Sequence, residues 1–519
     1  MSARISTAVI GSPAMALLVL SFGGTAAEAD LVISSKPTAN MSCENGFCEP
    51  TAAKAVLNAK DLEKFLKSFG NVTVQTTGQN GIEAQNLDIE AAFASPGGTM
   101  LNLFAKNAIR IDAHVTIGKG GQLSGLELVS DADPELLGDI SCGRHARISF
   151  VNTSDQFNIN GAVAVLVSSL RGLASAISSN PGGFYVLSDN YDAAQDGTYQ
   201  TSPIDTTFTG YFEALGNAIS HVKIEGGGED VGLFAETSNS EGFGVIRNVR
   251  LENASVKAGG VQSVGGLVGI VYGTVSQSSV SGEVTDTSSS EVSGGLAGTV
   301  YGSIVSSWST AKVGGANVNN ATGGLVGENY GTISNSYATG VVTGGGFIGG
   351  LVGANEDSSP TISGSFATGD VKIPGGGNEA FGGGLVGSDF GIVSDCYATG
   401  SVTDSGAGNQ GDALGGLIGL GADNISDSYA TGAVTGVGTD EVGGVVGDDE
   451  GSFADTYWDI TSSGVSQGAG NESNASGITS LTSKQLRSGL PDGFEKSLWR
   501  EKSGVNKGFP YLIANPPPK

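Results

Sequence analysis

The chain has 519 residues, of which 85 are glycine, and only 15% of its residues are charged. Its formal net charge of −27 at pH 7 argues against nucleic acid and anionic membranes as partners. The composition also excludes a disordered polyampholyte and a collagen-like chain. We therefore expect a folded, glycine-rich architecture.

Residues 1–29 have the order of segments found in a signal peptide. Arg4 is followed by an apolar stretch over 14–22, and Ala27-Glu28-Ala29 has the small-x-small pattern of a cleavage site. No later stretch reaches the roughly 18 apolar residues of a membrane helix. We expect the mature chain to be exported and not to insert into a membrane.

Residues 30–70 are predicted to form an N-terminal segment with a capping helix. The helix is predicted over Thr51–Ser68, where Leu57, Leu62 and Leu66 recur at helical spacing. A helix ahead of a stack of strands commonly covers the apolar side chains that the first layer would otherwise expose.

The four cysteines are consistent with an exported chain. Cys43 and Cys48 flank a four-residue turn and could close a small disulfide. Cys142 is isolated, whereas Cys396 takes a position that serine holds in related segments, so we expect it to be a buried small residue. A bridge between these two stays open, and no Cys/His spacing matches a zinc site.

Residues 71–225 are predicted to contain irregular coils of a β-solenoid and a lead-in region. Short strand-like pieces alternate with Gly and Asp turns in the first half, at Val72–Val74, Leu101–Phe104, Ile109–Ile111 and Val115–Ile117. A second helix is predicted over Leu166–Ile177, and a strand over 183–189.

Residues 226–459 consist of repeated copies of one sequence motif. Its glycine doublets recur at intervals of 26 to 34 residues, starting at Gly265, Gly294, Gly323, Gly349, Gly383, Gly415 and Gly443. A period of this size is typical of stacked repeats. The pieces between glycines are short and β-branched, which predicts strands. Glycine at the corners is expected to allow positive φ and tight turns.

Within a copy, the apolar positions keep a tighter register than the period. In the copy at Gly323, Leu325 is followed eight positions later by Ile333 and four positions further by Tyr337. We expect Leu325, Ile333, Tyr337 and Val342 to face inward and to stack on their counterparts about 4.8 Å away. The predicted fold is all-β: a parallel β-solenoid (a right-handed β-helix) with short capping helices.

The clearest copy of the repeat reads Gly-Gly-Leu-Val-Gly (323–327), then Ile333-Ser-Asn-Ser-Tyr-Ala-Thr-Gly340, then Val342. The repeat resembles the GLUG motif of large secreted bacterial proteins. These include filamentous-haemagglutinin-type adhesins and some immunoglobulin-A peptidases. The resemblance covers about 228–459. It implies a repetitive β stalk that is secreted by, or on the surface of, a Gram-negative bacterium, and it implies no reaction.

Residues 460–519 lie beyond the repeat and are predicted to form a C-terminal cap that closes the last exposed edge. Thr482-Ser-Lys-Gln485 has the pattern of a capping box at a helix start. A final strand is predicted over Gly508–Leu512.

The search for catalytic motifs is mostly negative. His114, His145 and His221 are dispersed and no His-Glu-x-x-His occurs, so the peptidase activity of some motif-bearing relatives is not carried over. Gly464-Val-Ser-Gln-Gly468 matches Gly-x-Ser-x-Gly but lacks a strand-to-helix context, and we interpret it as a chance match. No catalytic or cofactor-binding residue is predicted, and we expect no enzyme.

Two sets of carboxylates leave alternatives open. Asp448, Asp449 and Glu450 are candidates for holding a divalent cation, with calcium as the candidate ion. The alternative is a solvated acidic surface that keeps the stack soluble. Asp389 with Asp395 could serve a sugar-cleaving site, for which the alternative is solvated loop acids.

The first functional hypothesis is a non-enzymatic, adhesin-like protein whose solenoid displays variable loops to an extracellular protein or glycan. The loops are Ile373–Phe381 and Asp404–Leu414, the longest connections between repeats, although such loops can also be inert. Two other functions stay open: a secreted polysaccharide-active hydrolase or lyase on the same fold, and a purely structural spacer.

Overall fold

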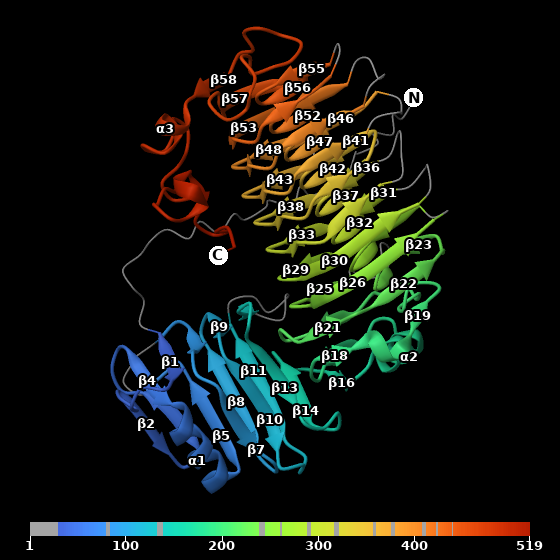
Figure 1. Cartoon of the computed structure of the whole chain (residues 1–519). Helices are drawn as coiled ribbons and strands as arrows, with labels where there is room; N and C mark the ends of the chain where they lie inside the picture. The colour runs from blue at the N-terminus through green and yellow to red at the C-terminus, as the bar shows by residue number, and fades with distance from the viewer. Residues whose placement is uncertain are drawn as a thin grey trace, which may run out of the picture.

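The computed structural model describes residues 30–78, 84–131, 139–237, 244–259, 262–287, 292–315, 321–356, 360–374, 379–406, 412–421, 424–437 and 440–518. The predicted signal peptide, residues 1–29, lies outside them. The described chain is mostly parallel β-structure (Figure 1), with α-helices at Ala59–Phe69 (α1), Leu170–Ser179 (α2) and Ser483–Leu486 (α3). The predicted fold class, a parallel β-solenoid with short helices, is confirmed.

The first solenoid spans 31–163 and has three sheets, each gaining strands from successive coils. In sheet order, the first contains β12 (Asp139–Cys142), β9 (Ala108–Ile111), β6 (Leu87–Ile89), β1 (Leu31–Ser34) and β4 (Ala55–Asn58). The second contains β13 (Arg147–Phe150), β10 (His114–Lys119) and β7 (Phe93–Pro96). The third contains β15 (Ala162–Val163), β14 (Gln156–Ile159), β11 (Gly125–Ser130), β8 (Met100–Ala105), β5 (Asn71–Gln75), β3 (Phe47–Pro50) and β2 (Met41–Glu44).

A second solenoid begins at β16 and continues through the repeats. Its lead-in strands are β16 (Val165–Val167), β17 (Phe184–Leu187), β18 (Tyr191–Asp192), β19 (Thr198–Tyr199), β20 (Tyr211–Glu213), β21 (Ala218–Ser220) and β22 (Lys223–Gly226). Helix α2 lies between β16 and β17 and buries Leu170, Leu173 and Ile177 in the core of this solenoid. The region 71–225 is thus divided between two solenoids.

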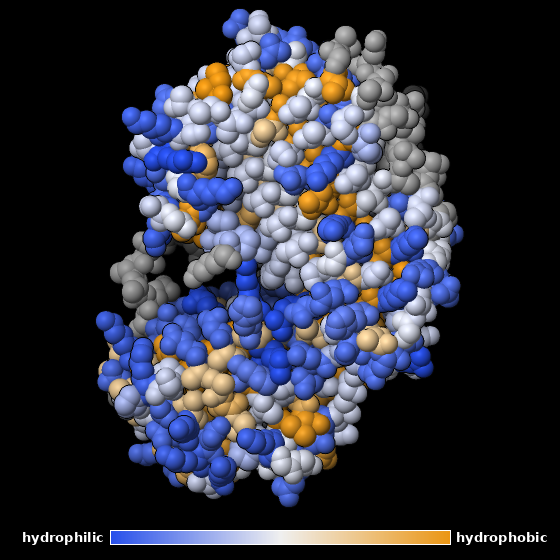
Figure 2. All heavy atoms as spheres, viewed as in Figure 1, coloured by the Kyte–Doolittle hydropathy of each residue, from blue (hydrophilic) through white to orange (hydrophobic). Residues whose placement is uncertain are grey.

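Polar contacts join the two solenoids. Arg250 Nη1 donates to the Arg144 carbonyl at 2.7 Å, and Arg247 Nη2 donates to the Ile140 carbonyl at 3.0 Å. Figure 2 shows hydrophilic side chains gathered where the two solenoids meet, while the face of the repeats in view is mostly of intermediate hydropathy.

Each repeat coil adds strands to three parallel sheets. The doublet sheet begins with β23 (Asp230–Val231), and each later strand ends at the first glycine of a doublet: β27 (Ser263–Gly265), β31 (Val292–Gly294), β36 (Ala321–Gly323), β41 (Phe347–Gly349), β46 (Phe381–Gly383), β51 (Ala413–Gly415) and β55 (Glu441–Gly443). The middle sheet follows: β24 (Phe234–Thr237), β28 (Val268–Val271), β32 (Ala297–Val300), β37 (Val326–Asn329), β42 (Val352–Asn355), β47 (Val386–Asp389), β52 (Ile418–Gly421) and β56 (Val446–Asp449).

The long sheet continues from the lead-in strands and takes up to three strands from each coil. These are β25 (Val245–Arg247), β26 (Arg250–Ala258), β29 (Thr274–Ser276), β30 (Ser279–Asp286), β33 (Ser303–Val305), β34 (Trp308–Ser309), β35 (Lys312–Gly314), β38 (Thr332–Ser334), β39 (Tyr337–Ala338), β40 (Val342–Thr343), β43 (Thr361–Ser363), β44 (Phe366–Ala367), β45 (Val371–Ile373), β48 (Ile392–Ser394), β49 (Tyr397–Ala398), β50 (Val402–Asp404), β53 (Asn424–Ala430), β54 (Val434–Thr435), β57 (Ser452–Asp459) and β58 (Ile478–Leu481).

The register of the stack follows the sequence repeat. Ile333 pairs with Ile362 one coil on, and Tyr337 pairs with Phe366. The eight-then-four spacing therefore specifies the pairing, because a one-residue slip would turn every side chain to the opposite face.

The glycine doublets are needed for close packing rather than for positive φ. A Cβ added at Gly323 would overlap the Val326 carbonyl oxygen, and one at Gly324 would overlap the Gly350 carbonyl oxygen. The left-handed turn falls instead at Asn335, with φ of 49°, between β38 and β39. The expectation that corner glycines supply positive φ is wrong for the doublets.

The four positions predicted to face inward are all buried, but they belong to three separate hydrophobic cores. Leu325 and Ile333 lie in the main core inside the coil. Tyr337 belongs to a second core, and its neighbour Ala338 points into the main one, as expected for adjacent residues of a strand. Val342 belongs to a third core. The predicted inward orientation is therefore wrong for Tyr337. It holds for Val342, whose column continues through Val313 to Val284 in the main core.

The second core is an aromatic ladder on the outer side of the long sheet. Its rings stack nearly parallel, with centroids 5.7, 4.8, 4.7 and 5.3 Å apart along Trp308, Tyr337, Phe366, Tyr397 and Tyr429. Residues of the C-terminal segment complete this core: Leu486, Phe494, Trp499, Phe509 and Leu512. The C-terminal segment thus covers a row of rings that would otherwise face solvent.

The path of the C-terminal segment explains this cover. Strand β58 extends the long sheet next to β57, and α3 begins with the predicted capping box at Thr482, which is confirmed. The chain then runs back along the side of the stack (red in Figure 1), through β59 (Trp499–Arg500) and β60 (Tyr511–Leu512). Asn515 Nδ2 reaches the Ser336 carbonyl at 3.1 Å, several coils from the end. The segment covers the side of the stack.

The two long helices begin later than predicted. Residues 55–58 form β4, which pairs with β1, so α1 begins at Ala59 behind an Asn58 cap. Residues 165–167 form β16, so α2 begins at Leu170 behind a Ser169 cap. The predictions for Thr51–Ser68 and Leu166–Ile177 are wrong at these N-termini, because parallel pairing outweighs helical spacing there. None of the described helices is long and apolar enough to cross a membrane.

The cysteines are as the sequence suggested. Cys43 and Cys48 form a disulfide that joins the hairpin strands β2 and β3. Cys396 is buried and its N–H donates to Ser428 Oγ at 3.0 Å, while Cys142 and Cys396 are both free thiols.

Candidate functional site

The three acidic residues predicted as cation ligands follow one another along the chain at the end of β56. Asp448 accepts a hydrogen bond from Asn471 Nδ2 at 2.5 Å, and Asp449 accepts one from the Gly451 N–H at 3.1 Å. Glu450 is exposed. Adjacent side chains of a strand point to opposite faces. Among the described residues, these three do not bring their carboxylates together into one group.

The other predicted carboxylates, Asp389 and Asp395, are part of the packing. Asp389 is fully buried at the end of β47 and accepts a hydrogen bond from Asn355 Nδ2 at 2.6 Å. Asp395 accepts one from Trp499 Nε1 at 2.9 Å, and burial raises its pKa. The interpretation of Asp389 as a solvated loop acid is therefore wrong, since its carboxylate lies inside the stack.

The Gly-x-Ser-x-Gly match lies between β57 and β58, without a following helix. The described histidine contacts lie in other parts of the chain: His114 Nε2 is 2.8 Å from Ser149 Oγ, and His221 Nδ1 is 2.9 Å from Asp192. Ser466 thus lacks the strand-to-helix elbow, and within the described ranges no hydrogen bond joins it to a histidine, as a nucleophile would need.

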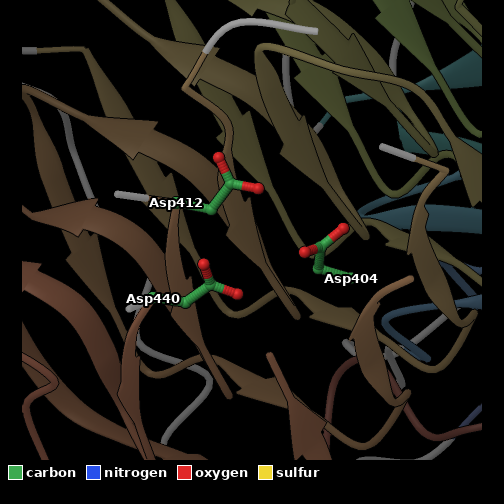
Figure 3. A group of neighbouring side chains, drawn as sticks. All are labelled: Asp404, Asp412 and Asp440. Carbon is green, nitrogen blue, oxygen red and sulfur yellow. The ribbon is translucent and has the colours of Figure 1, made fainter. Parts of the chain in front are cut away.

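A cluster of carboxylates that the sequence analysis missed lies at the edge between the long sheet and the doublet sheet. Asp404 ends β50, Asp412 immediately precedes β51, and Asp440 immediately precedes β55 in the next coil. Their nearest carboxylate oxygens all lie within 4.8 Å of one another (Figure 3). Asp404 is 2% exposed and Asp412 is fully buried.

One oxygen of each carboxylate in this cluster is held by a backbone N–H. Gly406 donates to Asp404 Oδ1 at 2.8 Å. Ala380, in the preceding coil, donates to Asp412 Oδ1 at 2.9 Å, and Val437 donates to Asp440 Oδ2 at 2.5 Å. The main chain of three successive coils thus fixes the three side chains.

The three carboxylates of the cluster repel one another if all of them are ionised. Burial raises the pKa of Asp440, and the neighbouring Asp404 carboxyl raises it further. The hydrogen bond from the Val437 N–H lowers this pKa. No lysine or arginine in the described ranges lies within ion-pair distance of Asp404 or Asp440. Like charges at this separation in a buried setting need a cation or a proton between them.

One signal in the sequence could have found part of this cluster. Asp412 and Asp440 each stand three residues before a doublet, Gly415 and Gly443, so the stack superposes them. Asp404 could not be found in this way, because its distance from the other two aspartates depends on where the connection re-enters the doublet sheet.

A second surface feature is a column of three tyrosines at the corner between the middle and long sheets, of which the middle one is exposed and the outer two are half-buried. Tyr272, Tyr301 and Tyr330 follow β28, β32 and β37, and their rings stack with centroids 4.8 and 4.9 Å apart. Tyr301 is 46% exposed. Because the ring faces cover one another, the middle ring can offer solvent mainly its edge and its hydroxyl.

Acidic side chains surround the tyrosine column. The Tyr330 hydroxyl donates to Glu328 Oε2 at 3.3 Å. Burial raises the pKa of Glu328, and the Glu356 carboxylate acts in the same direction. Burial also raises the pKa of Tyr301, followed by the effects of Tyr272 and Glu328. The column is thus a row of neutral phenols in an acidic setting.

The connections predicted to carry function leave and rejoin the stack at one edge. Strand β45 pairs with β50, and β46 pairs with β51, so the two connections start and end one above the other. Residues 375–378 of Ile373–Phe381 and 407–411 of Asp404–Leu414 lie outside the described residues.

The class of protein follows from these observations: a parallel β-solenoid built from glycine-doublet repeats. The family model of the GLUG motif matches residues 318–343, which is the clearest copy of the repeat. A search of curated proteins finds no match.

Among solved structures, the chain resembles a Bacteroides ovatus protein that is provisionally described as an immunoglobulin A1 protease. The two are 18% identical with a TM-score of 0.42, and the alignment covers 68% of this chain and 93% of the other. A likeness this distant carries no argument about activity.

Proposed function

We propose that the protein is an exported or cell-surface, adhesin-like binding protein, whose repeat solenoid presents an extended edge to a protein or glycan outside the cell. The observation that carries the proposal is the stacked column Tyr272–Tyr301–Tyr330 at the surface, with Tyr301 exposed and its two neighbours half-buried. The match to the GLUG motif adds support, because this motif occurs in secreted bacterial proteins.

The physical case for the column rests on its exposure and its rigidity. Tyrosine supplies a large contact area with a polar end, and it is enriched where proteins bind partners. The three rings are held in register by the strands below them, so little side-chain entropy would be lost on binding. The acidic neighbours favour a partner with basic or neutral contact groups.

The two long connections, Ile373–Phe381 and Asp404–Leu414, are a second candidate surface on a different edge of the coil. They vary in length while the strands that they join do not, which is how a rigid scaffold carries recognition loops. A binding assay can separate this surface from the tyrosine column.

The test begins with an array of host-matrix proteins, basic proteins and glycans, which identifies the partner. Tyr301→Ala, and a triple variant that also carries Y272A and Y330A, should then weaken binding about tenfold or more. Phe47→Ala is the matched control, because Phe47 is a 57% exposed aromatic on the first solenoid. Variants that lack 375–378 or 407–411 test the connections.

Each outcome assigns the surface. A loss confined to the tyrosine variants supports the column, and a loss confined to the shortened variants moves the site to the connections. Binding that survives all of them contradicts the proposal. Release of soluble sugars from a polysaccharide panel would instead favour the hydrolase or lyase, and no partner and no product would favour a structural spacer.

A further inference from the structure

The carboxylates of Asp404, Asp412 and Asp440 form an acidic group at the base of the connection Asp404–Leu414, with Asp404 and Asp412 buried and Asp440 half-buried. The group joins two coils of the stack. Asp404 and Asp412 lie at the two ends of one connection, and Asp440 belongs to the next coil. Asp412 is tied in addition to the preceding coil through the Ala380 N–H.

Buried oxygen atoms without partners point into this group. Asp404 is 2% exposed, and its Oδ2 accepts no hydrogen bond from any described residue, although Gly406 holds its Oδ1. Asp440 Oδ1 is likewise buried and receives no N–H or O–H from a described residue; its side chain lies beside the Asp404 carboxyl, while Val437 holds its Oδ2. A buried carboxylate oxygen without a partner costs free energy. Asp404 and Asp440 each have one carboxylate oxygen fixed by the main chain and one that could bind a cation.

The spacing and chemistry of the group fit a hard divalent cation. Calcium binds carboxylate and carbonyl oxygens at about 2.3–2.6 Å, so two oxygens on opposite sides of one ion lie about 4.6–5.2 Å apart. The three carboxylate oxygens here lie within 4.8 Å of one another. Magnesium prefers shorter bonds and retains more water, so calcium is the better match.

An ion could reach the group from solvent. Asp440 is half-buried and lines a surface hollow together with Val442, Ile460 and Gln467. The site therefore joins the solvent through Asp440, while Asp404 and Asp412 form its buried floor.

We propose that Asp404, Asp412 and Asp440 form a calcium site that ties the connection between β50 and β51 to the following coil. Binding neutralises most of the charge of the group and clamps the point where the chain leaves and re-enters the stack. The candidate residues Asp448, Asp449 and Glu450 are not part of this site.

The experiment uses the full chain, stripped of metal with a chelator and titrated with calcium chloride in a calorimeter at pH 7.5. We expect one calcium per chain with a dissociation constant below about 1 mM, and a rise in the thermal unfolding midpoint with added calcium. Asp404→Asn and Asp440→Asn should lose this binding at least tenfold. Asp448→Asn is the matched control and should bind as the parent does.

The same variants separate a calcium site from a group that is merely acidic. Removing one of three buried like charges should raise the unfolding midpoint of the metal-free protein, so Asp404→Asn should be more stable than the parent without calcium and less responsive to it. Absence of binding in the parent, or binding abolished by Asp448→Asn alone, would overturn the proposal. A metal-free parent that calcium leaves unchanged but that gains stability on acidification, with the gain lost in Asp440→Asn, would assign a shared proton instead.

Discussion

The indole N–H of Trp499 donates to the carboxylate of Asp395 across 2.9 Å, and so joins the C-terminal segment to the turn between β48 and β49. The Trp499 ring also lies 6.1 Å from Tyr397 and 6.0 Å from Tyr429, measured between ring centroids. One side chain thus contacts two successive rungs of the aromatic ladder. The C-terminal segment is consequently part of the hydrophobic core of the repeats.

Trp499→Ala should lower the free energy of unfolding by about 3–5 kcal/mol, because it removes a buried aromatic ring and leaves a cavity over the ladder. Trp499 is 1% exposed, whereas its neighbour Leu498 is 43% exposed, so Leu498→Ala is the control and should change stability little. Urea unfolding followed by tyrosine fluorescence measures both. Equal stabilities for the two variants would show that the segment does not stabilise the ladder.

The repeat could be predicted from the sequence because its rules are local. Leu325, Ile333, Tyr337 and Val342 keep fixed spacings in nearly every copy, and parallel stacking needs no other information to place them in register. What covers each column could not be predicted. A buried tyrosine at a fixed position has the same pattern whether its own coil or a distant segment covers it, and here the cover is Trp499 and its neighbours.

The acidic cluster was missed for a related reason. Asp448, Asp449 and Glu450 attract attention because they are adjacent in sequence, yet adjacency along a strand separates side chains onto opposite faces. Asp412 and Asp440 are 28 residues apart in the sequence and one coil apart in the stack. Proximity in a solenoid follows the coil period.

Leu325→Asp tests the main core. The substitution buries a carboxylate without a partner at a fully buried position and should destabilise the protein by about 3–5 kcal/mol. Thr332→Asp is the control, because Thr332 is only half-buried in a strand of the same coil. Thermal melts that coincide for the parent and Leu325→Asp would contradict the inward placement of this residue.

Asp230 should make stability depend on pH near neutrality. Burial, and then the Glu236 and Glu229 carboxylates, raise its pKa to about 6, against about 3.9 in an unfolded chain. The folded state therefore binds more protons than the unfolded state between these values. The stability contributed by this group is fully present below about pH 4 and is lost as the pH rises through about 6.

Asp230→Asn should flatten the fall of stability with rising pH over this window, measured as urea midpoints from pH 4 to 7.5. Asp192 is the control with the opposite sign, since the Ala194 N–H and then His221 lower its pKa. Asp192→Asn should therefore leave the fall between pH 5 and 7 unchanged. A slope that is the same in the parent and Asp230→Asn would contradict the assignment.

The last prediction concerns a ladder of polar side chains inside the middle sheet. Asn329 Nδ2 donates to Asn355 Oδ1 at 2.7 Å, and Asn355 Nδ2 donates to Asp389 Oδ1 at 2.6 Å, so one amide bridges three coils. Asn355→Asp keeps the shape but replaces the donor with a second carboxylate beside Asp389. The variant should lose about 3 kcal/mol or more at pH 8, where two buried like charges meet. The loss should shrink towards pH 5, because proximity raises the folded pKa of the pair and a shared proton restores a donor. Asn355→Ala, which removes the donor without adding charge, should lose less stability at pH 8 than Asn355→Asp does. If Asn355→Asp loses the same amount of stability at pH 5 and pH 8, a second buried charge beside Asp389 is not the cause of the loss, and the prediction is wrong.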